Sequence, residues 1–378
     1  MIKKNNFSKL LIFLIFVLLP FGQLPGFLID RLVKISFTIH PIDIVVIILG
    51  LINFNLKLAR AVIFVSLFSL ALSLGFFDPG KVVFGSLYLI RFIFYLIFPF
   101  VIRKYVGEDV GNKKSLVNLL VAIGVVIAII GFCQYLFFPD LRSLKYFGWD
   151  DHYFRLVGAF LDPAFMGIML ALAILASLFT STMWVTLLMT VALSLTYSRA
   201  SYLSLIIGLI VLSCFKKSFV KSSLAIIIFL LLSMPLLPRP KGEGVNLLRT
   251  NSIVQKNDNL GLSYKIVSKY PVFGVGFNNI CQARSLIEKD LPVNSCSGLD
   301  NSMLFIVATT GAVGAMIFVS FGINLWVKTK KNNSGLLFKV SLVAVIVHSQ
   351  FTNTLFYNFI LLWLGILIGI SRNFKENS

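Results

Sequence analysis

Several arginines of this 378-residue chain stand among apolar residues, where a charged side chain needs a physical reason. Arg199 lies in Thr-Tyr-Ser-Arg-Ala-Ser, Arg155 precedes Leu-Val-Gly-Ala-Phe, and Arg91 lies in Leu-Tyr-Leu-Ile-Arg-Phe-Ile. Arginine at membrane depth is costly and commonly marks a site or a pathway. A fixed guanidinium binds a phosphate group through two parallel hydrogen bonds. The alternative for Arg199 and Arg91 is an interfacial side chain whose charged head reaches water.

Two aspartates stand where apolar runs are interrupted. Asp162 precedes Pro163 inside an apolar run, which predicts a broken helix. Asp162 either caps the second half of that helix or contacts a substrate directly. Asp300 and Asn301 lie where a polar segment meets the next apolar run. Asp300 is either a helix cap or a carboxylate that orients or deprotonates an acceptor hydroxyl.

Three further patterns bear on the chemistry of the chain. The Gly-Val-Gly of residues 274–276 is followed by no Lys-Ser/Thr pair, so it predicts a tight turn rather than a phosphate cradle. Cys281 and Cys296 would form a structural disulfide in an oxidising compartment. Of the three histidines, His152 alone stands beside acidic residues in a place suited to a site. No metal-ligand spacing appears, and we expect neither a metal nor a cofactor.

The amino-acid composition indicates which kind of secondary structure positions these residues. Hydrophobic residues make up 58% of the chain and charged residues 13%, against about 25% charged residues in soluble domains. This excludes a soluble globular enzyme and predicts an all-α polytopic membrane protein. The net charge of +19 includes no basic run interleaved with aromatic residues, so we expect no nucleic-acid partner.

Apolar runs long enough to cross a bilayer predict about twelve transmembrane helices in a single membrane domain, 1–378. One large loop, 238–300, lies between the ninth and tenth helices. Within it, apolar residues at helical spacing predict an amphipathic helix over 257–270, ending near Tyr270 because Pro271 disfavours helical geometry before it. The predicted spans are 9–28, 37–54, 58–77, 82–102, 116–138, 156–179, 183–198, 200–215, 222–237, 301–326, 336–353 and 354–371.

The lysines and arginines of the short loops predict sidedness. Most of them fall in one alternate set of loops, which the positive-inside rule places in the cytoplasm together with the N- and C-termini. The loop 238–300 then lies outside, on the outer face of the membrane.

In their order, these motifs resemble the O-antigen ligase and polymerase superfamily, membrane glycosyltransferases of bacterial surface polysaccharide. The resemblance extends most clearly from about Arg155 to Phe318. Its motifs are Ser-Arg-Ala at a helix start, Pro-x-x-Gly-Val-Gly-Phe in one large late loop, Asp-Asn-Ser-x-Leu, and Thr-Gly-Ala-Val-Gly.

The resemblance implies a GT-C-like enzyme that takes a glycan from undecaprenyl pyrophosphate at the outer face of the inner membrane, without metal or nucleotide. Arg199 matches the superfamily's helix-start arginine best, Arg155 is the next match and Arg249 a looser one, and together they would bind the pyrophosphate. Asp300 and Arg199 would be the catalytic residues. Further candidates for the substrate site are Asp162, Asn301 and Arg91, and whether Arg249 or Lys256 takes the loop's basic role stays open.

One departure bears on function. Ligases of this superfamily, which attach polymer to lipid A-core, carry a His immediately before the Asn at the junction of loop and helix, and here Asp300 holds that place. This favours a repeat-unit polymerase over a ligase. A transporter of the lipid-linked glycan is less favoured, since no matching motifs appear in two halves of the chain. The expected partners are the lipid-linked oligosaccharide, membrane lipid and a regulator of polysaccharide chain length.

Overall fold

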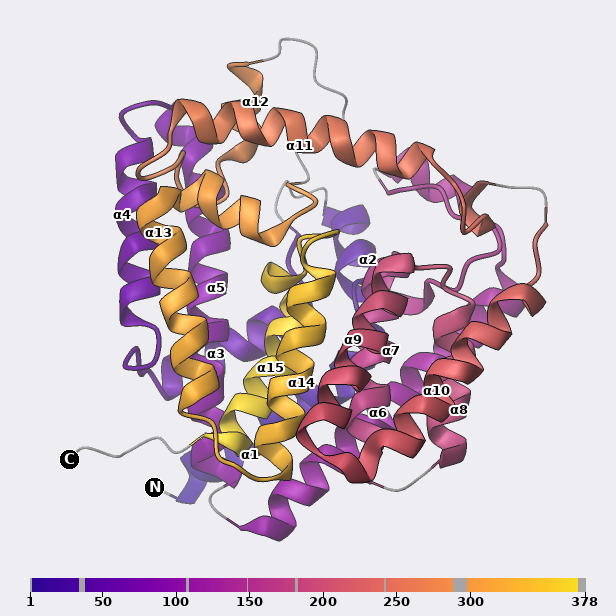
Figure 1. Cartoon of the computed structure of the whole chain (residues 1–378). Helices are drawn as coiled ribbons and strands as arrows, with labels where there is room; N and C mark the ends of the chain where they lie inside the picture. The colour runs from indigo at the N-terminus through magenta and orange to yellow at the C-terminus, as the bar shows by residue number, and fades with distance from the viewer. Residues whose placement is uncertain are drawn as a thin grey trace.

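The computed structural model describes residues 2–33, 38–106, 109–147, 149–180, 183–240, 243–287 and 298–372. In this part of the chain the regular elements are helices, and β-structure is limited to two isolated bridges, which confirms the all-α prediction (Figure 1). The α-helices are α1 (Ile2–Leu18), α2 (Leu24–Val33), α3 (Pro41–Ile52), α4 (Arg60–Ser73), α5 (Pro79–Val106), α6 (Val110–Phe137), α7 (Pro163–Ser177), α8 (Met183–Ser194), α9 (Arg199–Phe215), α10 (Val220–Ser233), α11 (Asn251–Lys269), α12 (Ile280–Ser285), α13 (Ser302–Val327), α14 (Asn333–His348) and α15 (Asn358–Ser371).

Among the described residues, four helical stretches are long and apolar enough to cross a membrane: Pro79–Val106, Gly111–Phe137, Lys217–Leu236 and Ser302–Val327. A bent pair, Asn6–Phe21 with Leu24–Leu32, makes a fifth if it is counted as one span. The other apolar helices have 10–17 residues. By length and composition these helices fit an integral membrane protein, but the predicted number of twelve spans is not confirmed.

The predicted spans 9–28 and 156–179 differ most from the observed helices. The span 9–28 is not one straight helix, because the chain bends by 87° between α1 and α2, where Pro20 lacks an N–H and Gly22 has φ +49°. The span 156–179 becomes helical only at Pro163. Before it, Leu161 has a left-handed conformation that no continuous helix accommodates.

The core surrounds α7, which packs against α6, α8, α9 and α14. Thirteen of the residues of α7 are buried, because the helix is apolar on every side and has neighbours on every side. On the other side of α14, α15 packs against α5, and α13 packs against α4. The amphipathic helix α11 runs across one end of this bundle (Figure 1) and ends at Lys269, which confirms the predicted stop before Pro271.

The Gly-Val-Gly segment is a tight turn, as predicted, and it packs into a break in α13. Gly274 and Gly276 have positive φ, and Gly311 interrupts α13 with φ +67°. The N–H groups of Val275 and Gly276 donate to the carbonyls of Ala308 (2.9 Å) and Thr309 (3.0 Å), which the break frees. Since these N–H groups are already bonded to α13, the turn does not offer them to a phosphate.

Candidate functional site

Arg155 and Arg249 converge on one carbonyl oxygen in the turn between α8 and α9. Tyr197, at φ +52° in this turn, accepts from Arg155 Nη2 at 3.5 Å and from Arg249 Nη2 at 3.2 Å. Arg155 Nε also donates to the carbonyl of Thr196 at 3.0 Å. Two arginines that are far apart in the sequence therefore donate to the same carbonyl oxygen, that of Tyr197.

Arg199 adds the third cation, as the first residue of α9. Its Nη1 donates to the carbonyls of Leu247 (3.3 Å) and Arg249 (3.1 Å) in the loop before α11. Ser198 caps α9 with its side chain. The structure thus brings together the three arginines predicted to bind pyrophosphate, and we call Arg155, Arg199 and Arg249 the arginine cluster.

The cluster concentrates positive charge away from water. Arg155 is 9% exposed, and its hydrogen bonds within the described part of the chain go to neutral carbonyl oxygens. Burial, reinforced by the charge of Arg249, lowers the pKa of Arg155 to about 10. The side chain is therefore still a cation at neutral pH, and an incoming anion would relieve the repulsion within the cluster.

His152 lies beside the cluster. It is 5% exposed, and within the described residues neither ring nitrogen has a hydrogen-bond partner. Burial lowers its pKa to about 4, the charges of Arg155 and Arg249 act in the same direction, and the carboxylates of Asp162 and Asp151 act against it. At neutral pH the ring is therefore neutral and retains a nitrogen lone pair for a hydrogen-bond donor.

Asp162 is the N-cap of α7. Its Oδ1 accepts from the backbone N–H groups of Ala164 (2.7 Å) and Phe165 (2.9 Å), which confirms the capping alternative. Pro163 fits the first helical position, where no N–H is needed. A direct role of Asp162 toward a substrate stays a prediction.

Asp300 is not the cap of α13. Asn301 caps it, because Asn301 Oδ1 accepts from the N–H groups of Met303 (2.8 Å) and Leu304 (3.1 Å). Asp300 Oδ2 instead accepts from Asn259 Nδ2 of α11 at 2.6 Å. This contact fixes the carboxylate from the side of the large loop.

Behind Asn259 lies Arg284, which sequence reasoning missed. Arg284 is 3% exposed, and its Nη2 donates to Asn259 Oδ1. The Asn259 side chain therefore has one orientation, with its N–H group toward Asp300. Nothing in the spacing of Arg284 within the loop indicates this role, since α11 and α12 form the contact through tertiary packing.

Lys256 of α11 lies within electrostatic reach of both parts of the site. Its Nζ donates to the carbonyl of Phe351. Burial lowers the pKa of Lys256, Asp300 and Asp162 oppose that shift, and Arg199 and Arg249 reinforce it. The helix α11 thus links the arginine cluster to Asp300.

His348 is a second residue that the sequence did not reveal. It is fully buried in α14, with Nε2 3.1 Å from Ser201 Oγ and Nδ1 2.6 Å from Thr354 Oγ1. Ser201 Oγ also lies 2.8 Å from Ser198 Oγ. His348 therefore ties α14 to the first turn of α9, and so supports the position of Arg199 indirectly. A lone His in an apolar run carries no signal of such a contact.

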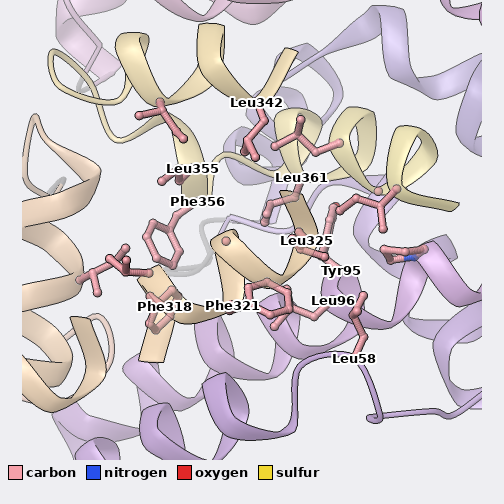
Figure 2. A pocket seen from close by; sticks show the side chains of 18 of the residues that line it. Leu58, Tyr95, Leu96, Phe318, Phe321, Leu325, Leu342, Leu355, Phe356 and Leu361 are labelled. Carbon is pink, nitrogen blue, oxygen red and sulfur yellow. The ribbon is translucent and has the colours of Figure 1, made fainter. Parts of the chain in front are cut away.

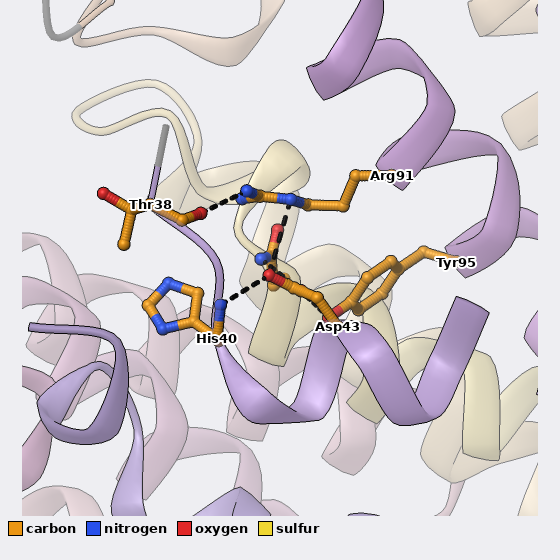
Figure 3. A network of polar contacts seen from close by, with 6 residues as sticks. Thr38, His40, Asp43, Arg91 and Tyr95 are labelled. Carbon is orange, nitrogen blue, oxygen red and sulfur yellow. Dashed lines mark hydrogen bonds and ion pairs between the residues drawn. The ribbon is translucent and has the colours of Figure 1, made fainter. Parts of the chain in front are cut away.

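Arg91 belongs to a separate polar network (Figure 3). Its Nε lies 3.5 Å from Asp43 Oδ2, and its Nη2 donates to the carbonyl of Thr38. Asp43 also accepts hydrogen bonds from Tyr95 and Asn358. Arg91 is 9% exposed, so it is buried in protein rather than an interfacial side chain that reaches water. These contacts hold α3, α5 and α15 together, and a role of Arg91 at a substrate site stays a prediction.

The remaining predictions concern the cysteines and metal binding. Cys281 lies in α12, but Cys296 lies outside the described residues, so their disulfide stays a prediction. Within the described part of the chain, no three His, Cys, Asp or Glu side chains gather in a way that could hold a metal ion.

When the sequence is compared with models of known protein families, part of the chain matches one family. Residues 184–319 match a family model described as O-Antigen ligase, and no curated protein matches the chain. The matched range holds Arg199, Arg249, Asp300, the Gly-Val-Gly turn and the break at Gly311. The match supports a function of the O-antigen ligase and polymerase type, carried out by a glycosyltransferase-like enzyme on lipid-linked polysaccharide in a membrane. Residues 184–319 are therefore similar to the O-antigen ligase family, and this match supports the predicted resemblance to the O-antigen ligase and polymerase superfamily.

Proposed function

We propose that this protein is a polymerase that joins undecaprenyl-pyrophosphate-linked oligosaccharide repeat units at the outer face of the bacterial inner membrane. The observation that carries the proposal is the arginine cluster at the end of the bundle that α11 covers. Three guanidinium groups from three segments of the chain form a concentration of charge suited to a lipid pyrophosphate.

In the proposed step, an acceptor hydroxyl oxygen attacks the anomeric carbon of the donor glycan. The bond from that carbon to the pyrophosphate oxygen breaks, and its electron pair leaves with undecaprenyl pyrophosphate. The arginine cluster stabilises the negative charge that develops on this leaving group. The hydroxyl proton passes to Asp300 or to another external carboxylate. In this scheme the arginines neutralise the leaving group, with neither metal nor nucleotide.

The identity of residue 300 favours a polymerase. Asn259 orients the Asp300 carboxylate, which holds the place where ligases of the superfamily carry a His. The alternative is a ligase that transfers polysaccharide to lipid A-core, and the description of the matching family model favours it. Both reactions use the same donor and differ in the acceptor.

The proposal includes a GT-C-like membrane domain over 1–378, an external segment 238–300, and both termini in the cytoplasm. Basic side chains at the end opposite α11 support this orientation. Lys104 contacts Asn53, Lys216 contacts Asn333, and Arg372 contacts Asn324. A chain-length regulator would act on the enzyme as a separate protein.

A gel profile of surface polysaccharide from a deletion strain tests the proposal. The strain is complemented with the wild-type gene or with Arg199→Ala, Arg199→Lys or Arg142→Ala. We expect single repeats on lipid A-core without the gene, long chains with wild type, and loss of long chains with Arg199→Ala. Arg199→Lys keeps the charge but not the planar fork, so we expect it to restore little. Arg142 is an exposed external arginine paired with Asp140, and its replacement should leave the ladder unchanged.

Other outcomes would change the assignment. Bare lipid A-core with long polymer accumulating on the undecaprenyl carrier would make the protein a ligase. An unchanged ladder with Arg199→Ala, at wild-type protein level in the membrane, would remove Arg199 from the site.

A further inference from the structure

We propose that Arg284 and Asn259 form a relay that positions the Asp300 carboxylate for the acceptor hydroxyl, so that both are positioning residues of the reaction. The inference rests on the proposed function and commits it to Asp300 as the group that takes the hydroxyl proton. The relay joins three segments of the chain: Arg284 lies on α12, Asn259 on α11, and Asp300 just before α13.

The direction of the relay follows from the chemistry of its two ends. A guanidinium carries only donors, and Arg284 Nη2 donates to Asn259 Oδ1. The Asn259 amide therefore turns its N–H group toward Asp300, where Nδ2 donates to Oδ2 at 2.6 Å. This contact uses Oδ2 as an acceptor. It leaves Asp300 Oδ1, which has no hydrogen-bond partner within the described residues, to receive a proton.

The relay is buried at its inner end and open at its outer end. Arg284 is 3% exposed, whereas Asn259 and Asp300 are half-buried. The contact between Arg284 and Asn259 is thus held inside the protein, while a substrate can reach the carboxylate. A general base needs this arrangement, because its proton-accepting atom must be accessible and its position must be fixed by neighbouring residues.

The groove beside this junction is apolar. Asn301 caps α13, and Met303 and Ile306 in the first turns of α13 line an apolar groove of about 360 Å³ together with Phe356 (Figure 2). The side chains of Met303, Ile306 and Phe356 carry no hydrogen-bond donor for a carboxylate. The donor that holds Asp300 comes instead from α11 and, behind it, from α12.

The test is the steady-state rate of glycan transfer by the full chain, purified in detergent, with a lipid-linked repeat unit as donor and acceptor. Asn259→Asp replaces the amide N–H group by a second carboxylate oxygen and keeps the shape of the side chain. Two carboxylates in contact share a proton, so Asp300 would no longer be free to accept one. We expect kcat to fall roughly 10- to 100-fold and KM to stay within about twofold.

The matched control is Asn257→Asp, the same change at an exposed position of α11, which should keep the wild-type kcat. Arg284→Met removes the donor behind Asn259 and should lower kcat about 2- to 10-fold. Asp300→Asn should lower kcat roughly 100-fold or more. In the Asp300→Asn background, neither Asn259→Asp nor Arg284→Met should lower kcat further, because the carboxylate on which the relay acts is gone.

The double variant Asn259→Asp with Asp300→Asn also separates positioning from packing. It rebuilds a hydrogen bond with donor and acceptor exchanged, so its melting temperature should be close to that of wild type while its kcat stays low. Three results would overturn the relay: a wild-type kcat for Asn259→Asp, equal losses for Asn259→Asp and Asn257→Asp, or a wild-type kcat for the double variant, which would make the contact purely structural.

Failure of the proposed function is recognised separately. If the wild-type protein transfers the glycan to lipid A-core and not to a repeat unit, it is a ligase, and the same variants assayed with lipid A-core decide whether the relay operates. If the wild-type protein elongates repeat units and Asp300→Asn keeps the full kcat, the relay is overturned and the polymerase activity stands.

Discussion

Arg155 shows how a single side chain can carry the chemistry proposed here. The buried guanidinium contacts the carbonyls of Thr196 and Tyr197, which leave its positive charge intact. Arg155→Lys keeps a cation but loses the planar fork that holds these carbonyls and a phosphate together. Since a hydrogen bond to a charged group is worth about 1.5–3 kcal/mol, we expect a loss of roughly 10- to 100-fold in transfer rate.

The measurement is the rate of chain elongation by the purified enzyme with a lipid-linked repeat unit as substrate. Arg142→Lys, at an exposed position paired with Asp140, is the control and should keep the wild-type rate. Full activity of Arg155→Lys would show that charge alone suffices at this position.

His152 predicts a pH dependence of stability. Its pKa is about 4 in the folded protein, against an ordinary value of 6.5, so between these values the unfolded chain binds the proton and the folded chain does not. The stability that the neutral ring contributes is therefore complete above pH 6.5 and is lost as the pH falls toward 4, by about 3 kcal/mol. Arg155 and Arg249 disfavour the charged ring, while Asp162 and Asp151 favour it.

Thermal unfolding in detergent between pH 4 and 7 tests this prediction. His152→Gln removes the titrating group, so its melting temperature should fall less steeply on acidification than that of wild type. Parallel pH profiles for the two proteins would show that His152 does not titrate in this range.

At the residue scale, sequence reasoning found the groups whose type was unusual for their surroundings. Arg199 and Arg155 stood out because cations are rare beside apolar runs, whereas Arg249 was predicted only from the family resemblance. Arg284 and His348 did not, because their partners Asn259 and Ser201 come from distant segments and only packing brings them together. The sequence also could not tell which residue caps α13, because Asp300 and Asn301 are both good capping residues; the structure shows that it is Asn301.

The Gly-Val-Gly turn and α13 form one unit at the scale of elements. A Cβ at Gly311 would lie 2.1 Å from the carbonyl oxygen of Val272, and the backbone there has φ +67°, which L side chains rarely adopt. We expect Gly311→Ala to destabilise the protein by about 3 kcal/mol or more, because strain and steric clash add.

Gly322→Ala is the matched control on the same helix, where a Cβ meets nothing within 4 Å. Its effect should stay within about 1 kcal/mol, the difference in helix propensity. Thermal unfolding of both variants in detergent makes the comparison. Equal melting temperatures would mean that the turn does not pack against the break in α13 as described.

Element boundaries were predictable where one residue fixes them. Pro271 placed the end of α11, and the Asp162–Pro163 pair marked a break that proved to be the start of α7. The bend between α1 and α2 was missed, because the apolar run continues through it and hydropathy alone does not report a change of direction. Hydropathy also overestimated the length of some helices, since the predicted spans 37–54, 58–77 and 354–371 correspond to α3, α4 and α15, which have 12, 14 and 14 residues.

For the whole molecule, the charge asymmetry of the loops predicts which end faces the cytoplasm. Lys217 follows α9 at the end rich in basic residues, and Asp258 lies on α11 at the opposite end, and both are exposed. In a background with all four native cysteines replaced (Cys133→Ser, Cys214→Ser, Cys281→Ser and Cys296→Ser), a single cysteine is introduced by Asp258→Cys or by Lys217→Cys. A membrane-impermeant maleimide applied to intact spheroplasts should label the protein carrying Asp258→Cys. It should label the protein carrying Lys217→Cys only after lysis, because the positive-inside rule retains that loop in the cytoplasm. The reverse pattern would place the arginine cluster in the cytoplasm, where it would face nucleotide-linked donors rather than an outward-facing lipid pyrophosphate, and the proposed reaction would fail with it.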